Sequence, residues 1–182
     1  MSKLRQIYMV RHAGLLSDET ALNMSDEVAV RESCRAMGGL LAGKVIVIFH
    51  ANSKSCRLTA EVIASELKNP LGGHGRPLEV VVEKARALTS KQEDATNKVL
   101  HSFVMDLKTR SKSVNVMFMV AGYDALKRIK THLLGTHPTF KNLGVANPVE
   151  PEVGYGQGYV LDDFFHSILE WRQYSHLIRS GR

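Results

Sequence analysis

Short apolar runs alternate with segments of helical spacing along most of this chain. Continuous runs rich in β-branched residues are typical of strands buried on both faces, and four are present: residues 7–10, 45–49, 78–82 and 114–120. Apolar residues at helical spacing predict four helices: 26–41, 54–67, 91–107, and from the turn at 121–124 to about 134. Two last runs, 158–165 and 168–174, indicate strands, although the second is also compatible with a helix. This alternation predicts an α/β fold with a mostly parallel sheet, which we expect to form a single domain of residues 1–182.

The first predicted helix has five candidate core positions: Val28, Cys34, Met37, Leu40 and Leu41. Ser25, directly before it, is expected to be its N-cap. Segments rich in glycine and proline predict loops at 69–77 and 135–158. The last of these loops ends in the glycine-rich residues 154–158, which we interpret as a turn because no strand-to-helix pattern of a phosphate loop surrounds them.

Composition narrows the class of protein. The 24 basic and 18 acidic residues give a net charge of +6, but the basic residues are dispersed. We therefore interpret them mainly as side chains on solvent-exposed faces of the protein. Electrostatic steering of a phosphorylated substrate is the second interpretation, and we expect no nucleic-acid partner. Two cysteines, Cys34 and Cys56, without metal-ligand spacing indicate a reducing compartment and no metal site. No signal-peptide pattern and no apolar run of about 18 residues occur, so we expect a cytoplasmic protein without a membrane partner.

The chemistry begins where the first strand ends. Arg11 and His12 come directly after the run at residues 7–10. In an open α/β sheet the ligand crevice lies beyond the carboxyl ends of the strands. A guanidinium fork placed there suits an anionic phosphate, and an imidazole suits a nucleophile or a general base. The alternative is a strand that simply ends in two polar residues.

Three segments carry a resemblance to a known family. They read IYMVRHAG at 7–14, VIVIFHANSKSCRLTAEVIASEL at 45–67 and VMFMVAGYDAL at 116–126. In this order, the chain resembles the histidine phosphatase superfamily, and in size it is nearest to the small bacterial phosphohistidine phosphatases of the SixA type. The resemblance implies a single three-layer domain with a mostly parallel central sheet, the phosphoglycerate mutase-like fold.

The resemblance also implies a mechanism. His12 would attack phosphorus and become a phosphohistidine, while Arg11, a second arginine and a second histidine neutralise the phosphoryl oxygens. An acidic side chain often protonates the leaving group, and neither a metal nor another cofactor is needed. The implied substrate is a phosphohistidine or a small phosphomonoester, so the implied partner is a phosphorylated small molecule or a phosphoprotein.

The chain departs from the family pattern at two cationic positions. The second arginine falls on Ser55 and the second histidine on Tyr123, which donates a hydrogen bond but carries no charge near neutral pH. Loss of one preorganised donor commonly costs on the order of 10²–10³ in rate. Ala13 also stands in the place of the motif's glycine.

Several residues are candidates to compensate. His50, at the end of the second strand, is a candidate for the missing imidazole, or else a strand-end residue bonded to backbone. Lys54 and Arg57 flank Ser55 and are candidates for the missing cation, or else solvent-facing helix charges. Glu83 is the candidate proton donor.

These residues support three hypotheses. The first is a phosphatase of weak activity with His12 as nucleophile and Arg11 as clamp. The alternative is a catalytically inactive family member that binds a phosphorylated ligand or protein at the same pocket. The third is a basic interaction protein with a vestigial pocket. The sequence leaves the substrate, the proton donor and the oligomeric state open.

Overall fold

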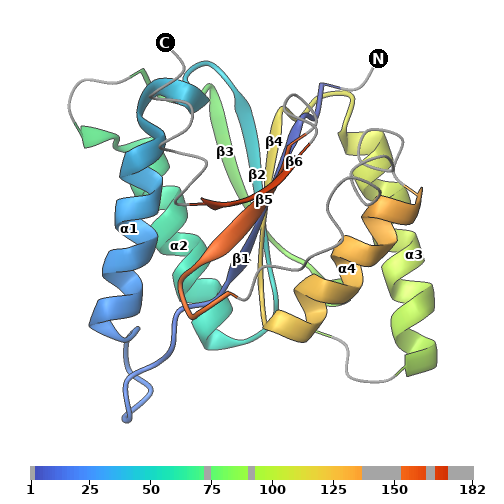
Figure 1. The fold of residues 1–182 in the computed structure, drawn as a ribbon, viewed down its shortest axis with the longest axis horizontal. Helices are drawn as coiled ribbons and strands as arrows, with labels where there is room; N and C mark the ends of the chain where they lie inside the picture. The colour runs from blue at the N-terminus through green and yellow to red at the C-terminus, as the bar shows by residue number, and fades with distance from the viewer. Residues whose placement is uncertain (1–2, 72–74, 90–92, 137–152, 163–166, 172–182) are drawn as a thin grey trace.

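The computed structural model describes most of the chain, namely residues 3–71, 75–89, 93–136, 153–162 and 167–171 (Figure 1). The strands are β1 (Gln6–Arg11), β2 (Val45–His50), β3 (Glu79–Lys84), β4 (Val116–Ala121), β5 (Gly158–Asp162) and β6 (Ser167–Glu170). The α-helices are α1 (Met24–Met37), α2 (Lys54–Lys68), α3 (Glu93–Arg110) and α4 (Tyr123–Thr136). Two short 3-10 helices are η1 (Gly38–Leu41) and η3 (Arg86–Leu88).

The six strands form one sheet in the order β3-β2-β4-β1-β5-β6. The strands β3, β2, β4 and β1 are parallel, whereas β5 runs antiparallel to β1 and β6 antiparallel to β5. Helices α1 and α2 cover one face of the sheet, and α3 and α4 cover the other (Figure 1). The expected α/β fold with three layers and a mostly parallel sheet is therefore confirmed.

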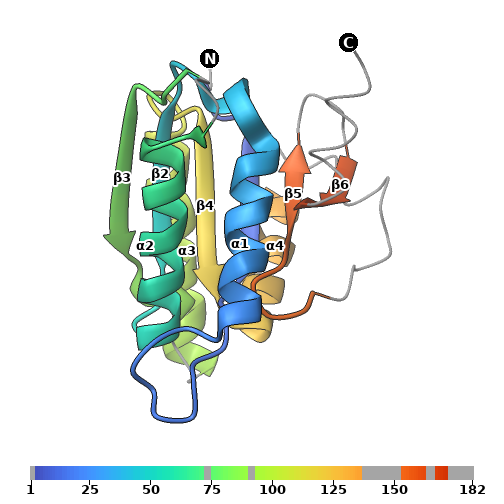
Figure 2. The same ribbon diagram turned by 90° about the vertical axis from the view of Figure 1, so that its left-hand side faces the viewer.

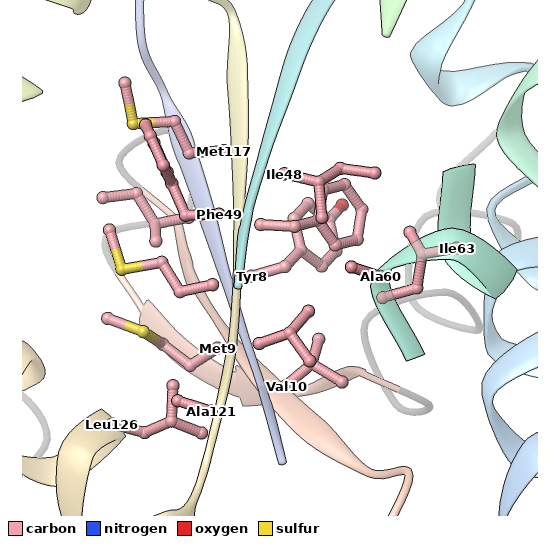
Figure 3. Close-up of a cluster of buried hydrophobic side chains, with 14 of the residues drawn as sticks. Tyr8, Met9, Val10, Ile48, Phe49, Ala60, Ile63, Met117, Ala121 and Leu126 are labelled. Atoms are coloured by element: carbon pink, nitrogen blue, oxygen red, sulfur yellow. The ribbon is translucent and has the colours of Figure 1, made fainter. Parts of the chain in front are cut away.

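The core lies on both faces of the parallel strands. On one face, Tyr8 and Ile48 point towards Ile63 of α2 (Figure 3). On the other, Met9 lies on the side of Leu126 of α4 (Figure 3), and the ring of Phe49 packs edge-on against that of Phe103 in α3. Successive side chains of a strand alternate between faces. Because both faces are covered by helices, every residue of β4 is buried. The sequences of the parallel strands are therefore continuous apolar runs and do not alternate between apolar and polar residues.

Trp171 adds to this core on the face of the sheet that carries Tyr8 and Phe118. Its side chain is buried and makes edge-on contacts with the rings of Tyr8 and Phe118, which stack on each other with centroids 4.5 Å apart. Aromatic pairs of this kind add to the free energy of burial. The residue just after β6 therefore anchors the antiparallel edge to the centre of the sheet.

The first helix differs from its prediction. It begins at Met24, so Ser25 lies in the first turn and is not the N-cap; instead Ser25 donates its backbone N–H to Asn23 Oδ1. Val28 is 45% exposed, and Val30 is buried in its place. Val30, Cys34 and Met37 have the spacing of one helical face, whereas Val28 falls outside that stripe.

The same helix also ends earlier than predicted. It stops at Met37, and residues 38–41 form the tighter η1, in which Leu41 is buried. The bounds of the other elements agree with the predictions to within three residues where the chain is described. Parts of the predictions for 135–158, 158–165 and 168–174 lie outside the described residues, and the extent of the domain over residues 1–182 stays a prediction.

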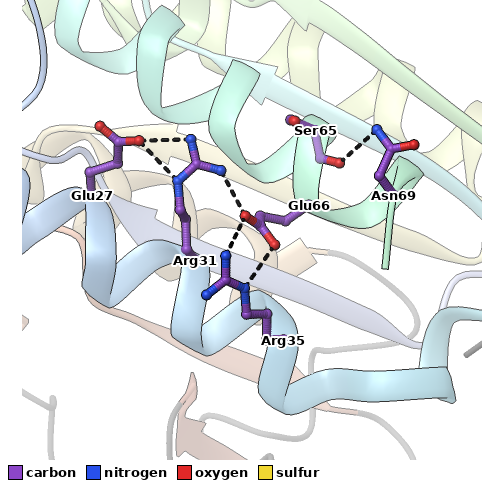
Figure 4. A network of polar contacts seen from close by, with 6 residues as sticks. All are labelled: Glu27, Arg31, Arg35, Ser65, Glu66 and Asn69. Carbon is purple, nitrogen blue, oxygen red and sulfur yellow. Dashed lines mark hydrogen bonds and ion pairs between the residues drawn. The ribbon is translucent and has the colours of Figure 1, made fainter. Parts of the chain in front are cut away.

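An ion-pair network joins the two helices on the α1–α2 face (Figure 4). Arg31 bonds both Glu27 and Glu66 at 2.7 Å, and Arg35 bonds Glu66 at 3.1 Å. Burial opposes ionisation of Glu66, but the hydrogen bonds from both arginines outweigh it and lower the pKa of this carboxyl. The network thus holds α1 against α2. Within the described residues no helix is long and apolar enough to span a lipid bilayer.

Candidate functional site

The site lies at the carboxyl ends of two neighbouring parallel strands whose following helices lie on opposite faces of the sheet. The chain leaves β1 towards α1, and it leaves the adjacent β4 towards α4 on the other face (Figure 1). A crevice opens at such a switch point, beyond the carboxyl ends of the strands. The loop after β1 lies at the end of the sheet where β3 and β4 terminate (Figure 2). Arg11 and His12 are at this edge, and Arg11 is in register with Ala121 of β4.

His12 is held in one defined tautomer. Its backbone N–H donates to Ala121 O at 3.1 Å, which fixes the main chain beside β4. Its Nδ1 lies 2.9 Å from Ala13 O. Because a carbonyl oxygen only accepts, Nδ1 must carry the proton, and the neutral ring then has its lone pair on Nε2. The half-buried imidazole therefore has its lone pair on Nε2.

Arg11 is wrapped by residues 153–157. The guanidinium donates from Nη1 to Val153 O at 2.9 Å, and its Cζ lies 3.9 Å from the centre of the Tyr155 ring. The main chain of Arg11 donates to Gln157 O at 2.8 Å and accepts from Gly156 N at 3.1 Å. Four contacts from one short segment thus orient this cation, which loses less freedom on binding an anion than an unrestrained side chain would.

The turn at residues 153–157 needs a glycine at position 156. Gly156 has φ +71°, and a Cβ there would lie 2.6 Å from the backbone oxygen of Asp26 in α1. Only glycine adopts this conformation at so close an approach without strain. The prediction of a turn is confirmed, but the sequence did not indicate that this turn supports Arg11.

Tyr123 and Arg11 line the same pocket, which has a volume of about 510 Å³. The described residues that line it are Arg11, Tyr123, Val153 and Gly154. Tyr123 is the first residue of α4, where the positive end of the helix dipole also favours an anion. His12 is not among these described lining residues, but its ring is 5.5 Å from that of Tyr155, which packs on Arg11. The structure therefore brings Arg11, His12 and Tyr123 to one edge of the sheet.

Ser55 lies close to the backbone just after His12. It is buried in the first turn of α2, and its Oγ is 3.1 Å from Ser53 Oγ. Its carbonyl accepts from Thr59 Oγ1 at 2.7 Å, and the same Oγ1 accepts from Ala13 N at 3.0 Å. Thr59 thus connects the first turn of α2 to the residue after His12. Ser55 supplies a neutral hydroxyl where the family pattern has an arginine.

His50 is at the same edge but on another strand. It is 8% exposed, and its Nδ1 lies 2.8 Å from Ala51 O, which gives it the same tautomer as His12. Strand β4 separates β2 from β1, so the two strands lie about 10 Å apart. His50 is in register with Val120, which is in register with Val10 rather than with His12. The backbone bond proposed as the alternative for His50 is present.

The remaining candidates have other surroundings. Arg57 is half exposed and pairs with Glu61 one turn along α2 at 2.7 Å. Lys54 is exposed at the start of α2. Glu83, on β3, binds Arg110 at 2.7 Å. The structure does not bring these side chains to Arg11 and His12, because Lys54 and Arg57 are exposed on α2 and β3 is three strands from β1.

Sequence reasoning missed Tyr155, Thr59 and Asp26. Asp26 Oδ2 accepts the backbone N–H of Gly14 at 2.9 Å, two residues beyond His12. A signal existed for Tyr155, since an aromatic residue between two glycines is unusual in a plain turn. No spacing rule indicated Asp26, whose partner is on a loop. Among the described residues, no three His, Cys, Asp or Glu side chains gather as a metal site.

Comparison with known proteins identifies the fold. No protein-family model matches the sequence, and no curated protein matches it significantly. Among solved structures, the protein histidine phosphatase SixA complexed with tungstate is 13% identical with a TM-score of 0.56, over 91% of this chain and 93% of the other. A protein assigned as a phosphohistidine phosphatase SixA, from Agrobacterium tumefaciens, is 11% identical with a TM-score of 0.54, over 87% and 92%.

A mutase shares the same architecture. Phosphoglycerate mutase from Plasmodium falciparum is 11% identical with a TM-score of 0.51, over 91% of this chain and 97% of the other. Identities this low establish the fold and not the activity. The chain has the phosphoglycerate mutase-like fold of the histidine phosphatases, as its three sequence segments predict.

Proposed function

We propose that the chain is a phosphatase-type hydrolase that acts on a phosphohistidine or a small phosphomonoester. The observation that carries the proposal is the geometry of His12. Its Nδ1 is bound to Ala13 O, so its lone pair is on Nε2, and the ring of Tyr155 lies against both this imidazole and the guanidinium of Arg11. A nucleophile and a guanidinium at the carboxyl edge of a parallel sheet are the minimum for phosphoryl transfer.

The reaction takes two steps at His12. Nε2 forms a bond to phosphorus while the bond from phosphorus to the leaving group breaks, and the leaving group departs with the electron pair and gains a proton. Water then attacks the phosphohistidine, inorganic phosphate leaves, and Nε2 regains its lone pair. Arg11 stabilises the charge on the phosphoryl oxygens, and Tyr123 donates a neutral hydrogen bond. An imidazole leaving group needs the least help from an acid, which favours a phosphohistidine.

The fold supports this proposal through its neighbours. One SixA structure contains tungstate, a tetrahedral oxyanion with the shape of phosphate, and its fold covers nearly the whole of this chain. The partner of this chain would accordingly be a phosphorylated small molecule or a phosphoprotein.

A specific observation favours a second candidate, which is binding without turnover. Arg57 is paired with Glu61, and Ser55 and Tyr123 are neutral. Among the described pocket-lining residues, Arg11 is then the one full positive charge. With so little charge stabilisation, binding would persist while the chemical step becomes slow.

Phosphoenzyme trapping separates the two candidates. We expect wild-type protein to hold acid-labile, alkali-stable phosphate after mixing with phenyl phosphate or a phosphohistidine peptide. His12→Asn keeps an amide donor close to the place of Nδ1 but has no nucleophile, so its phosphoenzyme and its turnover should both vanish. His101→Asn is the control, because His101 is exposed on α3.

Each outcome decides something. Labelling of wild type and of the His101 variant, with none of the His12 variant, supports the phosphatase. No labelling, but phosphate binding by ³¹P NMR that Arg11→Ala abolishes, supports the binding protein. Neither labelling nor phosphate binding contradicts both candidates.

A further inference from the structure

Two hydrogen bonds converge on one peptide group beside His12. The carbonyl of Ala13 accepts from His12 Nδ1 at 2.9 Å, and the N–H of Gly14 donates to Asp26 Oδ2 at 2.9 Å. These carbonyl and N–H groups belong to the same peptide unit, which lies between the carboxylate and the imidazole. A carboxylate bound to the N–H of an amide polarises that amide and makes its oxygen a stronger acceptor.

The surrounding chain holds this peptide unit in place. The preceding peptide is fixed because Ala13 N donates to Thr59 Oγ1, and the following one because Asn23 N donates to Gly14 O at 2.7 Å. A Cβ at Gly14 would lie 3.0 Å from Asp26 Oδ2, so the carboxylate approaches the main chain closely. Asp26 itself is fixed in the first turn of α1.

We propose that Asp26 is a positioning residue that acts on His12 through the Ala13–Gly14 peptide. This inference rests on the proposed function of His12. When Nε2 bonds to phosphorus, the imidazole ring gains positive charge, and the proton on Nδ1 becomes more acidic. The polarised carbonyl of Ala13 stabilises that charge and holds the ring in the reactive tautomer. A carboxylate bound directly to a catalytic histidine serves the same purpose in hydrolytic triads; here a peptide unit stands between them.

The test compares Asp26→Asn with Glu27→Gln. Asparagine keeps an oxygen that accepts from Gly14 but loses the charge, whereas Glu27→Gln removes the same charge from the same helical turn, where Glu27 binds Arg31 instead. The first readout is the NMR resonance of the His12 Nδ1 proton, assigned with His12→Asn. We expect Asp26→Asn to shift it upfield, towards a weaker hydrogen bond, and Glu27→Gln to leave it in place.

The second readout is phosphoryl transfer. Loss of the charge-assisted bond should slow phosphoenzyme formation by about 10-fold. KM for phosphoenzyme formation, measured in a single turnover, should stay unchanged, because Asp26 Oδ2 binds the main chain at Gly14. Asp26→Ser, which removes the carboxylate and shortens the side chain, should act in the same direction and serves if the asparagine variant does not fold.

The outcomes distinguish this inference from the proposed function. If wild-type protein forms no phosphoenzyme, the phosphatase proposal fails, while the Nδ1 resonance still tests Asp26. The inference is overturned if Asp26→Asn and Glu27→Gln leave the resonance at the same position. It is also overturned if Asp26→Asn raises KM and leaves the rate of phosphoenzyme formation unchanged.

Discussion

At the scale of single residues, the site is defined by how Arg11 and His12 are held rather than by their identity alone. The guanidinium of Arg11 has the ring of Tyr155 on its face and the carbonyl of Val153 on one nitrogen. Guanidinium nitrogens carry five donors, so several remain for an oxyanion. Orientation by neighbours is what makes one cation useful in an open pocket.

Replacement of Tyr155 should loosen this cation. A cation–π contact at a partly exposed position contributes about 1 kcal/mol, which corresponds to roughly fivefold in affinity. We therefore expect Tyr155→Ala to weaken phosphate binding by about fivefold, and Tyr155→Phe, which keeps the ring face, to bind like wild type. ³¹P NMR or calorimetric titration with inorganic phosphate measures both. Equal loss in the two variants would mean that the hydroxyl, not the stacking, matters.

At the scale of elements, the α1–α2 pair is joined by charges as well as by apolar contacts. Glu66 accepts hydrogen bonds from Arg31 and Arg35, and the exposed pair of Arg57 and Glu61 lies on the same helix (Figure 4 shows the first group). Surface ion pairs contribute little by themselves, whereas shielded, shared carboxylates contribute more. The two groups therefore make a matched comparison.

Stability should depend on pH through Glu66. Its pKa is lower in the folded protein than the ordinary value of 4.5, because the hydrogen bonds from Arg31 and Arg35 exceed the opposing effect of burial. The unfolded chain then binds a proton at higher pH than the folded chain, so this contribution is complete above pH 4.5 and is lost as pH falls below it. Thermal unfolding from pH 3 to 7 should show that loss in wild type.

The variants extend the same experiment. Glu66→Gln should have a lower unfolding temperature than wild type at pH 7. The difference between the two proteins should become smaller as the pH falls. Glu61→Gln should change the unfolding temperature little at any pH, because its partner is exposed. A pH dependence that is identical in wild type and Glu66→Gln would show that other carboxyls account for it.

At the scale of the whole molecule, strand order places the site. β1 lies between the parallel β4 and the antiparallel β5, so the crevice beside Arg11 opens on one side and the wrapping segment 153–157 enters β5 on the other. The pairing of β1 with β5 is close: a Cβ at Gly158 would collide with the carbonyl oxygen of Met9. The site therefore depends on an intact antiparallel edge.

Two glycine variants test this dependence. Gly158→Ala should destabilise the protein by about 2 kcal/mol or more, because backbone must shift to admit the methyl group. It should also weaken phosphate binding through the displaced 153–157 turn. Gly135→Ala, in α4 with open space around its Cβ, should stabilise by about 0.5–1 kcal/mol. Denaturant unfolding measures both, and a neutral Gly158→Ala would contradict the close pairing.

Much of the fold could be predicted because buried strands and helices leave periodic patterns. The run at residues 7–10 indicated the first strand. Because Arg11 and His12 follow this run directly, the sequence also placed them at the carboxyl end of that strand. The prediction for Val28 was wrong because Val28 lies outside the helical face that Cys34 and Met37 share, whereas Val30 lies on that face and is buried. The surroundings of His50, Arg57 and Glu83 could not be predicted, because their partners, the carbonyl of Ala51, Glu61 and Arg110, are decided by the folded structure.

The sequence by itself determined the α/β class, the order of the elements and the place of Arg11 and His12, for which we propose the chemistry, because these depend on local pattern and on the residue types at the end of each strand. Only the tertiary structure decided what holds them. Tyr155 lies over Arg11, and Asp26 reaches His12 through a peptide unit, from segments distant in sequence. Such contacts arise from the pairing of β1 with β4 and β5 and from the packing of α1, and no local spacing in a chain encodes them.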